Sequence, residues 1–168
     1  MKTVLKILYI AVGLFLLIFL ESFFSSVFAF KIIFLVFLFA YKKVDWKELF
    51  AVTSVMSLVM DVVMHYKLGT NLLLFVIPLG LFSLFTLFSS VEDGIGAYIV
   101  RFFSIFLYYI LSLLLPPLLL IGALGDINGR SVLYSFIASL ISVLLLFLIN
   151  YMIGGIRKRG SQSQIRLK

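Results

Sequence analysis

The sequence predicts an all-α integral membrane protein, a bundle of six transmembrane helices with both termini in the cytoplasm. Of its 168 residues, 64% are hydrophobic and only 12% are charged, whereas a soluble domain carries about 25% charged residues. The apolar residues also form long runs. A helix that rises about 1.5 Å per residue needs roughly 20 of them to cross about 30 Å of hydrocarbon.

Six apolar runs predict the spans, and they cover residues 4–24, 27–41, 49–64, 70–88, 99–121 and 132–153. The second run ends at Lys42 and Lys43. The third follows Asp45, which we expect to cap the helix while Glu48 reaches back to it, as in a capping box. The second and third runs are short enough to be tilted or partly re-entrant, so five spans remain an alternative.

The first run has a second interpretation, because Lys2 and Lys6 precede it and Val27-Phe28-Ala29 follows it. This order of residues is also that of a signal peptide with its cleavage site. The apolar stretch is longer than the usual signal core of about 7–15 residues. We therefore expect the first run to be retained as a helix.

Charge sets the orientation of the bundle. With six spans, both termini share one side with the second and fourth connections, and of the 14 Lys and Arg residues only Lys31, Lys67 and Arg130 lie on the other side. The positive-inside rule therefore places both termini in the cytoplasm. We expect residues 1–156 to form a single transmembrane helical domain. Residues 157–168 should form a basic, disordered cytoplasmic tail near anionic lipids.

Composition also argues against several functions. The net charge of +7 does not indicate nucleic acid, because the basic residues lie between and after apolar runs and not on one solvated face. Cysteine is absent and His65 is the single histidine, so we expect neither a metal site nor a cofactor. No HExxH, GxSxG or Walker motif is present. We therefore expect a protein that is not an enzyme and has no catalytic residues.

Ionisable residues within spans are costly and are candidates for function. Asp61, near the end of the third run, is the strongest, and His65 or Lys67 could pair with it. It could anchor the following loop, contact a partner helix, or handle a substrate or protons. We expect Glu21 to snorkel to the interface in a structural role, and Asn71 to form a hydrogen bond between helices.

Residues 57–74, SLVMDVVMHYKLGTNLLL, contain a recognisable pattern. A small-residue apolar helix ends at an aspartate, a short polar turn follows, and Leu68-Gly69 opens the next apolar helix. This region resembles the signature of the rod shape-determining protein MreD family. It departs from that signature at Ser57, where glycine is usual, and at Lys67, where proline is common. Within the turn, an aspartate can bond to free backbone groups and glycine permits a tight bend.

The resemblance implies a non-catalytic scaffold of the bacterial cell-elongation machinery, a multi-pass protein of the cytoplasmic (inner) membrane. The implied partners are the single-span protein MreC, the actin-like filament MreB and the peptidoglycan polymerase–transpeptidase pair. The residues expected to stabilise this region or contact a partner are Asp61, Leu68, Gly69 and Asn71.

The alternative is a substrate-binding subunit of an energy-coupling factor transporter. Such subunits resemble this chain in size, in having six helices and in lacking catalytic motifs. Many carry Ala-xxx-Ala on the first helix. Here Ala11 occupies the first position of such a motif, but Phe15 stands four positions later, where the second alanine would be. In this alternative, outer-loop residues such as Tyr66, Asn71 and Asp126 would hold a ligand.

Overall fold

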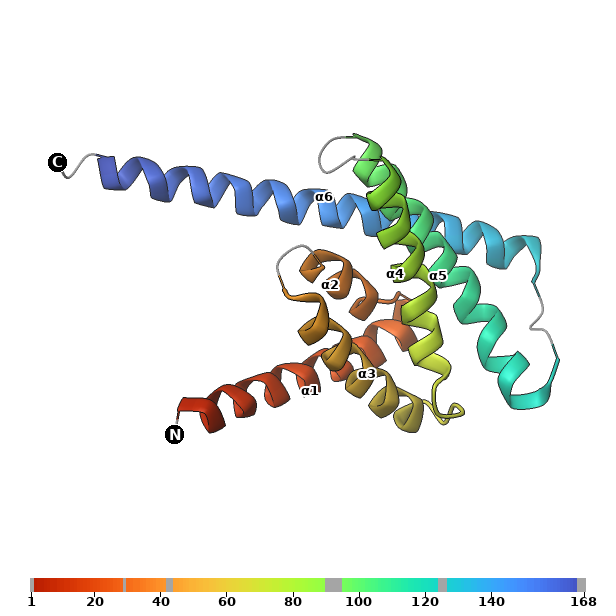
Figure 1. Ribbon diagram of the computed structural model, residues 1–168. Helices are drawn as coiled ribbons and strands as arrows, with labels where there is room; N and C mark the ends of the chain where they lie inside the picture. Colours follow the sequence, from red (N-terminus) through yellow and green to blue (C-terminus); the bar gives the residue numbers. More distant parts are fainter. Residues whose placement is uncertain (1, 29, 42–43, 90–94, 124–126, 166–168) are drawn as a thin grey trace.

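The computed structural model describes residues 2–28, 30–41, 44–89, 95–123 and 127–165, and this part of the chain is helical apart from its connections (Figure 1). It contains six helices: α1 Lys2–Phe28, α2 Ile33–Ala40, α3 Trp46–Val63, α4 Thr70–Ser89, α5 Ile95–Ile121 and α6 Gly129–Ile165. The predicted all-α architecture is therefore confirmed for the described residues.

Figure 1 shows how the helices are arranged. The start of α1 lies at the lower left and the end of α6 at the upper left. The α3–α4 connection lies at the lower right, and α5 ends further to the right, below the start of α6. Helices α4 and α5 lie side by side and α6 crosses them, while α3 packs on α4.

Helix α2 is the centre of the core. Of its eight residues, five are buried: Ile33, Phe34, Leu35, Phe37 and Leu38. The ring of Phe34 stacks on Tyr108 of α5, with centroids 4.3 Å apart and planes 3° from parallel, and Phe75 of α4 stacks within 6.2 Å of Phe34. Such aromatic pairs contribute about 0.5–1.5 kcal/mol each beyond the burial of their area. The three rings therefore connect α2, α4 and α5.

The expected second span is wrong in its extent. Residues 27–41 divide among the end of α1, a turn at residues 30–32, and α2. Eight helical residues rise about 12 Å, less than half of the roughly 30 Å of a hydrocarbon core. A carboxylate of α1 binds the backbone at the start of α2, as described below, so the second helix begins later than the apolar run does.

Among the described residues, two helices are long and apolar enough to cross a membrane by length and composition, Gly96–Ile121 within α5 and Gly129–Met152 within α6. Shorter apolar stretches occupy Val12–Val27 and Thr70–Thr86. This pattern is consistent with a helical membrane protein. Exposed large apolar side chains occur on all six helices, among them Phe15 of α1, Val62 of α3 and Leu144 of α6.

Two helix ends differ from the sequence-based predictions. Asp45 is the N-cap residue of α3, as predicted, but its side chain makes no capping hydrogen bond, so the expected capping box is not formed. Asp45 and Glu48 are both exposed, where water can satisfy the free N–H groups of the first turn. Helix α6 continues to Ile165, through most of the segment for which we expect a disordered tail.

Candidate functional site

The connection between α3 and α4 reverses the chain within six residues. The amide of Tyr66 donates to the carbonyl of Asp61 at 2.8 Å, and that of His65 donates to the carbonyl of Val62 at 3.3 Å. These two bonds form a Schellman motif, in which the residue after the helix adopts a left-handed conformation. Here it is His65, with φ of 57°. The imidazole Nδ1 lies 3.1 Å from the same Val62 carbonyl oxygen, a position from which a protonated Nδ1 donates to it.

The side chain of Asp61 points back into this turn and binds the start of α4. Its Oδ2 accepts a hydrogen bond from the backbone N–H of Gly69 at 2.7 Å. Its Oδ1 accepts two more, from the backbone N–H of Asn71 at 2.8 Å and from the Asn71 side-chain Nδ2 at 2.9 Å. The first N–H groups of a helix have no partner within it, and they attract negative charge. Asp61 therefore caps α4 from the end of α3.

Burial makes this cap strong. Asp61 is fully buried and Asn71 is 3% exposed, so water does not compete for their hydrogen bonds. The neighbouring Thr70 adds a second closure, because its Oγ1 donates to the carbonyl of Lys67 at 2.7 Å. Gly69 has φ of 94°, which glycine adopts without the steric cost that a side chain brings. The α3–α4 turn is thus held by both backbone shape and a buried carboxylate.

Three of the four residues singled out from the sequence meet in this turn, namely Asp61, Gly69 and Asn71. The fourth, Leu68, is 72% exposed and takes no part in the network. Asn71 bonds to a neighbouring helix as expected. His65 and Lys67 do not pair with Asp61 in the described structure, where Lys67 is exposed. Both carboxylate oxygens are used by the chain itself, which favours a structural role for Asp61.

A second buried carboxylate, that of Glu21, lies at a place where the sequence predicts an exposed one. Glu21 of α1 is fully buried and does not reach an interface, so the expected snorkelling is wrong. Its Oε2 accepts hydrogen bonds from the backbone N–H groups of Ile32 at 2.5 Å and Ile33 at 2.9 Å. These donors stand at the start of α2, where Ile32 occupies the N-cap position and offers no side-chain acceptor. Glu21 caps α2 from the end of α1.

A signal for Glu21 was present in the sequence. Residues 30–33, Phe-Lys-Ile-Ile, contain no Ser, Thr, Asp or Asn to cap a helix. An apolar helix that begins there needs an acceptor from elsewhere, and Glu21 is the acid that precedes it at the end of α1. The other carboxylate oxygen, Oε1, has no hydrogen-bond partner among the described residues.

No cluster of three or more metal-binding side chains occurs in the part of the chain that the structure describes. The hydroxyls of the buried serines of α6 form hydrogen bonds with carbonyl groups of their own helix. Ser139 Oγ donates to the carbonyl of Ser135 at 2.6 Å and Ser142 Oγ donates to that of Ala138 at 2.7 Å. Because these hydroxyls are occupied and small, they let α6 pack closely on its neighbours.

No protein-family model, curated protein or solved structure matches this chain.

Proposed function

We propose that this chain is a non-catalytic scaffold of the bacterial cell-elongation machinery, embedded in the cytoplasmic membrane. Its six helices, including the short buried α2, would carry the chain back and forth and leave both termini in the cytoplasm. In this role the chain binds a single-span MreC-like protein and links it to peptidoglycan synthesis.

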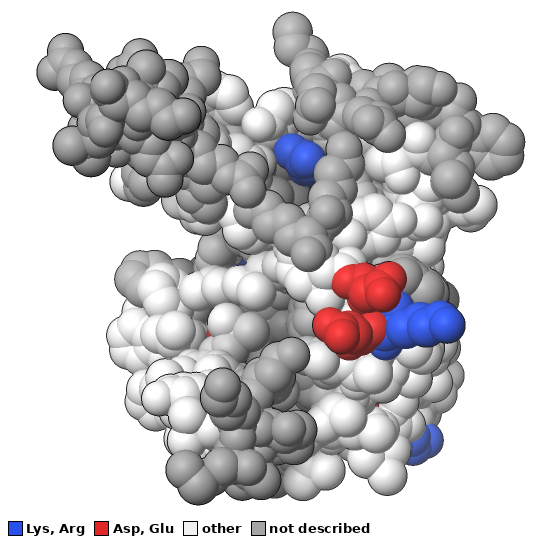
Figure 2. Space-filling view, turned by 60° about the vertical axis from the view of Figure 1, so that its left-hand side comes forward, with Lys and Arg blue, Asp and Glu red and all other residues white. Residues whose placement is uncertain are grey.

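The distribution of side chains supports placement in a membrane. Soluble monomers rarely expose an apolar patch larger than a few hundred Å², whereas here exposed apolar residues occur on every helix. Figure 2 shows one face on which side chains without charge cover most of the described surface, and the acidic residues there form one small group beside basic ones. The distribution of Lys and Arg along the sequence supports the orientation with both termini in the cytoplasm.

The observation that carries the scaffold proposal is the geometry of Asp61. The aspartate of the MreD-like segment binds the backbone of Gly69 and Asn71, so the residues that carry the resemblance form one rigid turn. Because both of its carboxylate oxygens accept hydrogen bonds within the turn, the group serves to position α3 against α4. A fixed helical hairpin suits a protein that works by presenting helix faces to other helices.

Helix α1 offers a surface for such contacts. Its side chains Leu8, Phe15 and Phe19 are 60%, 70% and 65% exposed, and α1 packs on the remaining helices mainly through α2. In a membrane, helices associate by close packing of such faces and not by hydrophobic exclusion from water. We propose that α1 contacts the single helix of the MreC-like partner. Contacts with the MreB filament, with the polymerase–transpeptidase pair, and of the basic C-terminal residues with anionic lipids, would follow from that assembly.

The test is affinity purification of the tagged protein from its own host in mild detergent, with the bound proteins identified by mass spectrometry. Recovery of MreC-like and peptidoglycan-synthesis proteins is the expected result. A matched sample carrying Phe15→Ala and Phe19→Ala should lose the MreC-like protein while keeping its helix content. Recovery of ATPase subunits together with a coupling membrane protein would replace the scaffold with the transporter subunit.

A further inference from the structure

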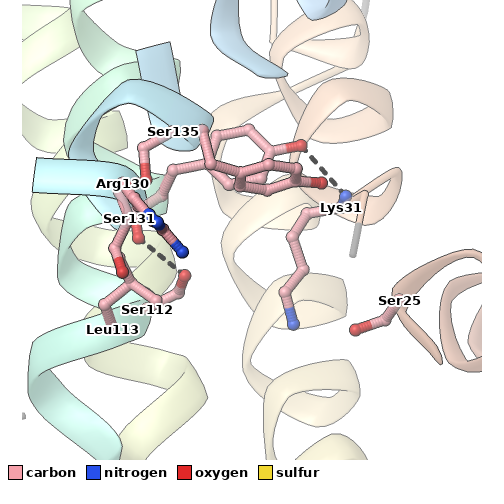
Figure 3. A pocket seen from close by; sticks show the side chains of 9 residues that line it. Ser25, Lys31, Ser112, Leu113, Arg130, Ser131 and Ser135 are labelled. Atoms are coloured by element: carbon pink, nitrogen blue, oxygen red, sulfur yellow. Dashed lines mark hydrogen bonds between the residues drawn. The ribbon is translucent and has the colours of Figure 1, made fainter. Parts of the chain in front are cut away.

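A pocket of about 410 Å³ lies where the end of α1, the turn before α2, α5 and the start of α6 meet. Most of its lining residues carry a polar group, and the two basic ones, Lys31 and Arg130, are accompanied by the hydroxyls of Ser25, Ser112 and Tyr109. In Figure 3, Lys31 and Ser25 point toward one another from the α1–α2 side, while Arg130 and Ser112 gather on the opposite side. The pocket therefore has a basic group on each of two facing walls.

The position of Lys31 is fixed by its backbone. Its N–H donates to the hydroxyl of Tyr109 at 3.0 Å, which connects the α1–α2 turn to α5. The side chain is only partly exposed, so its ammonium is partly removed from water and gains from an anionic partner. Neither Lys31 nor Arg130 forms an ion pair with another residue of the described structure.

Among the described residues around the pocket, the charge balance is positive. Glu21 is the acid that attracts Lys31, but its Oε2 is already bound to the backbone of Ile32 and Ile33. Arg130 is the second residue of α6, and the free N–H groups of that helix start add partial positive charge. In this part of the described structure, the positive charge comes from two basic side chains and a helix start. The negative charge comes from one acid, whose carboxylate is bound to the backbone of α2. This arrangement favours a bound anion such as a phosphate.

An apolar groove of about 380 Å³ adjoins the basic pocket, and Tyr134 lines both. The groove contains Phe24 and Phe30 on one side and Ile137, Ile141 and Leu145 of α6 on the other. From Tyr134 to Leu145, α6 rises about 16 Å, a length suited to part of an extended hydrocarbon chain. A soluble anion would leave this groove unused.

We propose that the pocket and groove together form a binding site for an anionic membrane lipid with a phosphate in its headgroup. Lys31 and Arg130 hold the phosphate, the Ser25 hydroxyl donates to one of its remaining oxygens, and one hydrocarbon chain follows α6 from Tyr134 toward Leu145. The site requires the membrane placement proposed above, where it faces the outer leaflet. It does not depend on the scaffold partners.

The test compares binding of phosphatidylglycerol and phosphatidylcholine to the purified full-length protein in neutral detergent, measured by native mass spectrometry over a lipid titration. We expect the wild type to prefer phosphatidylglycerol, and Lys31→Gln with Arg130→Gln to reduce that preference about tenfold, since charge-assisted hydrogen bonds are the strong ones. The matched control is Lys47→Gln with Lys67→Gln, which removes the same charge at two exposed positions and should bind as the wild type does.

Two further measurements separate the components of the site. Ile141→Trp fills the groove and should weaken both lipids, whereas Ile149→Trp, on the same helix and outside the groove, should not. Inorganic phosphate or glycerol phosphate should compete only weakly with the lipid. Competition by these soluble anions as strong as that by phosphatidylglycerol overturns the lipid assignment in favour of a soluble ligand.

Folding of each variant is checked by its helix content and by gel filtration. If the double variant does not fold, Arg130→Gln alone carries the test, because Arg130 is exposed and its loss leaves the core untouched. An unchanged preference for phosphatidylglycerol in a folded Arg130→Gln protein, measured against Lys67→Gln, overturns the proposal.

Discussion

The α1–α2 and α3–α4 connections use the same device with different completeness. In each, a fully buried carboxylate near the end of one helix accepts hydrogen bonds from backbone N–H groups at the start of the next, Glu21 for α2 and Asp61 for α4. Asp61 uses both oxygens and binds a side chain as well. Glu21 uses one oxygen, and the other has no partner among the described residues.

The two carboxylates differ in how many hydrogen bonds they accept from the protein, three for Asp61 and two for Glu21. The three bonds to Asp61 compensate for removing its carboxylate from water, and both of its oxygens bind groups of the turn. Glu21 is compensated in part by two bonds and in part by the attraction of Lys31. We therefore infer that the α3–α4 turn is the more rigid of the two turns. The α1–α2 turn adjoins the region that we propose binds an anion.

The largest effect on stability is expected from Asp61→Ala. It leaves the N–H groups of Gly69 and Asn71 buried without an acceptor, and each such donor costs roughly 1–3 kcal/mol. We expect a loss of about 3 kcal/mol or more in the free energy of unfolding, measured by circular dichroism during titration of micelles with a denaturing detergent. Asp45→Ala is the control, because Asp45 is exposed and makes no capping bond. Equal stability of the two variants would contradict the role given to Asp61.

Amide substitutions test the comparison itself. In Asp61→Asn, one amide NH₂ must face a backbone donor, because both oxygens of Asp61 accept hydrogen bonds. In Glu21→Gln, the amide oxygen can replace Oε2 while the NH₂ takes the place of Oε1, which has no described partner. We expect a loss of about 2 kcal/mol for Asp61→Asn and less than about 1 kcal/mol for Glu21→Gln, by the same unfolding titration. The reverse order would mean that the hydrogen bonds of Glu21 contribute more to the free energy of unfolding than those of Asp61.

Backbone shape gives a smaller, separable contribution at Gly69. A Cβ placed there meets nothing within 4 Å, so the cost of Gly69→Ala comes from its φ of 94° alone. We expect a loss of about 1–2 kcal/mol. Gly80→Ala, inside α4 and equally unobstructed, should be neutral or stabilise the helix by up to about 1 kcal/mol. Unfolding titrations that show equal effects for the two would contradict a conformational role for Gly69.

These two turns also show what sequence reasoning could reach. Asp61, Gly69 and Asn71 lie within eleven residues of one another and include turn-forming types, so local chemistry brings them together. Glu21 and Ile33 lie in two successive apolar runs, 4–24 and 27–41, and hydropathy does not show at which residue of such a run a helix begins. The extent of α2 was therefore missed. The pocket around Lys31 depends on residues of α5 and α6 that are 78 or more positions away along the chain, and no local pattern could place them there.

The smallest effect on stability, and the sharpest test of whether the rigid α3–α4 turn is also a contact surface, is expected at Leu68. This side chain is 72% exposed and lies outside the Asp61 network, so Leu68→Ala should change the free energy of unfolding by less than about 0.5 kcal/mol. If the turn presents Leu68 to the MreC-like partner, the variant should recover less of that protein in the affinity purification while unfolding as the wild type does. Lys67→Ala, at the adjacent exposed position, is the control. Normal recovery with Leu68→Ala would confine the function of this turn to holding α3 against α4, and leave the exposed face of α1 as the contact surface.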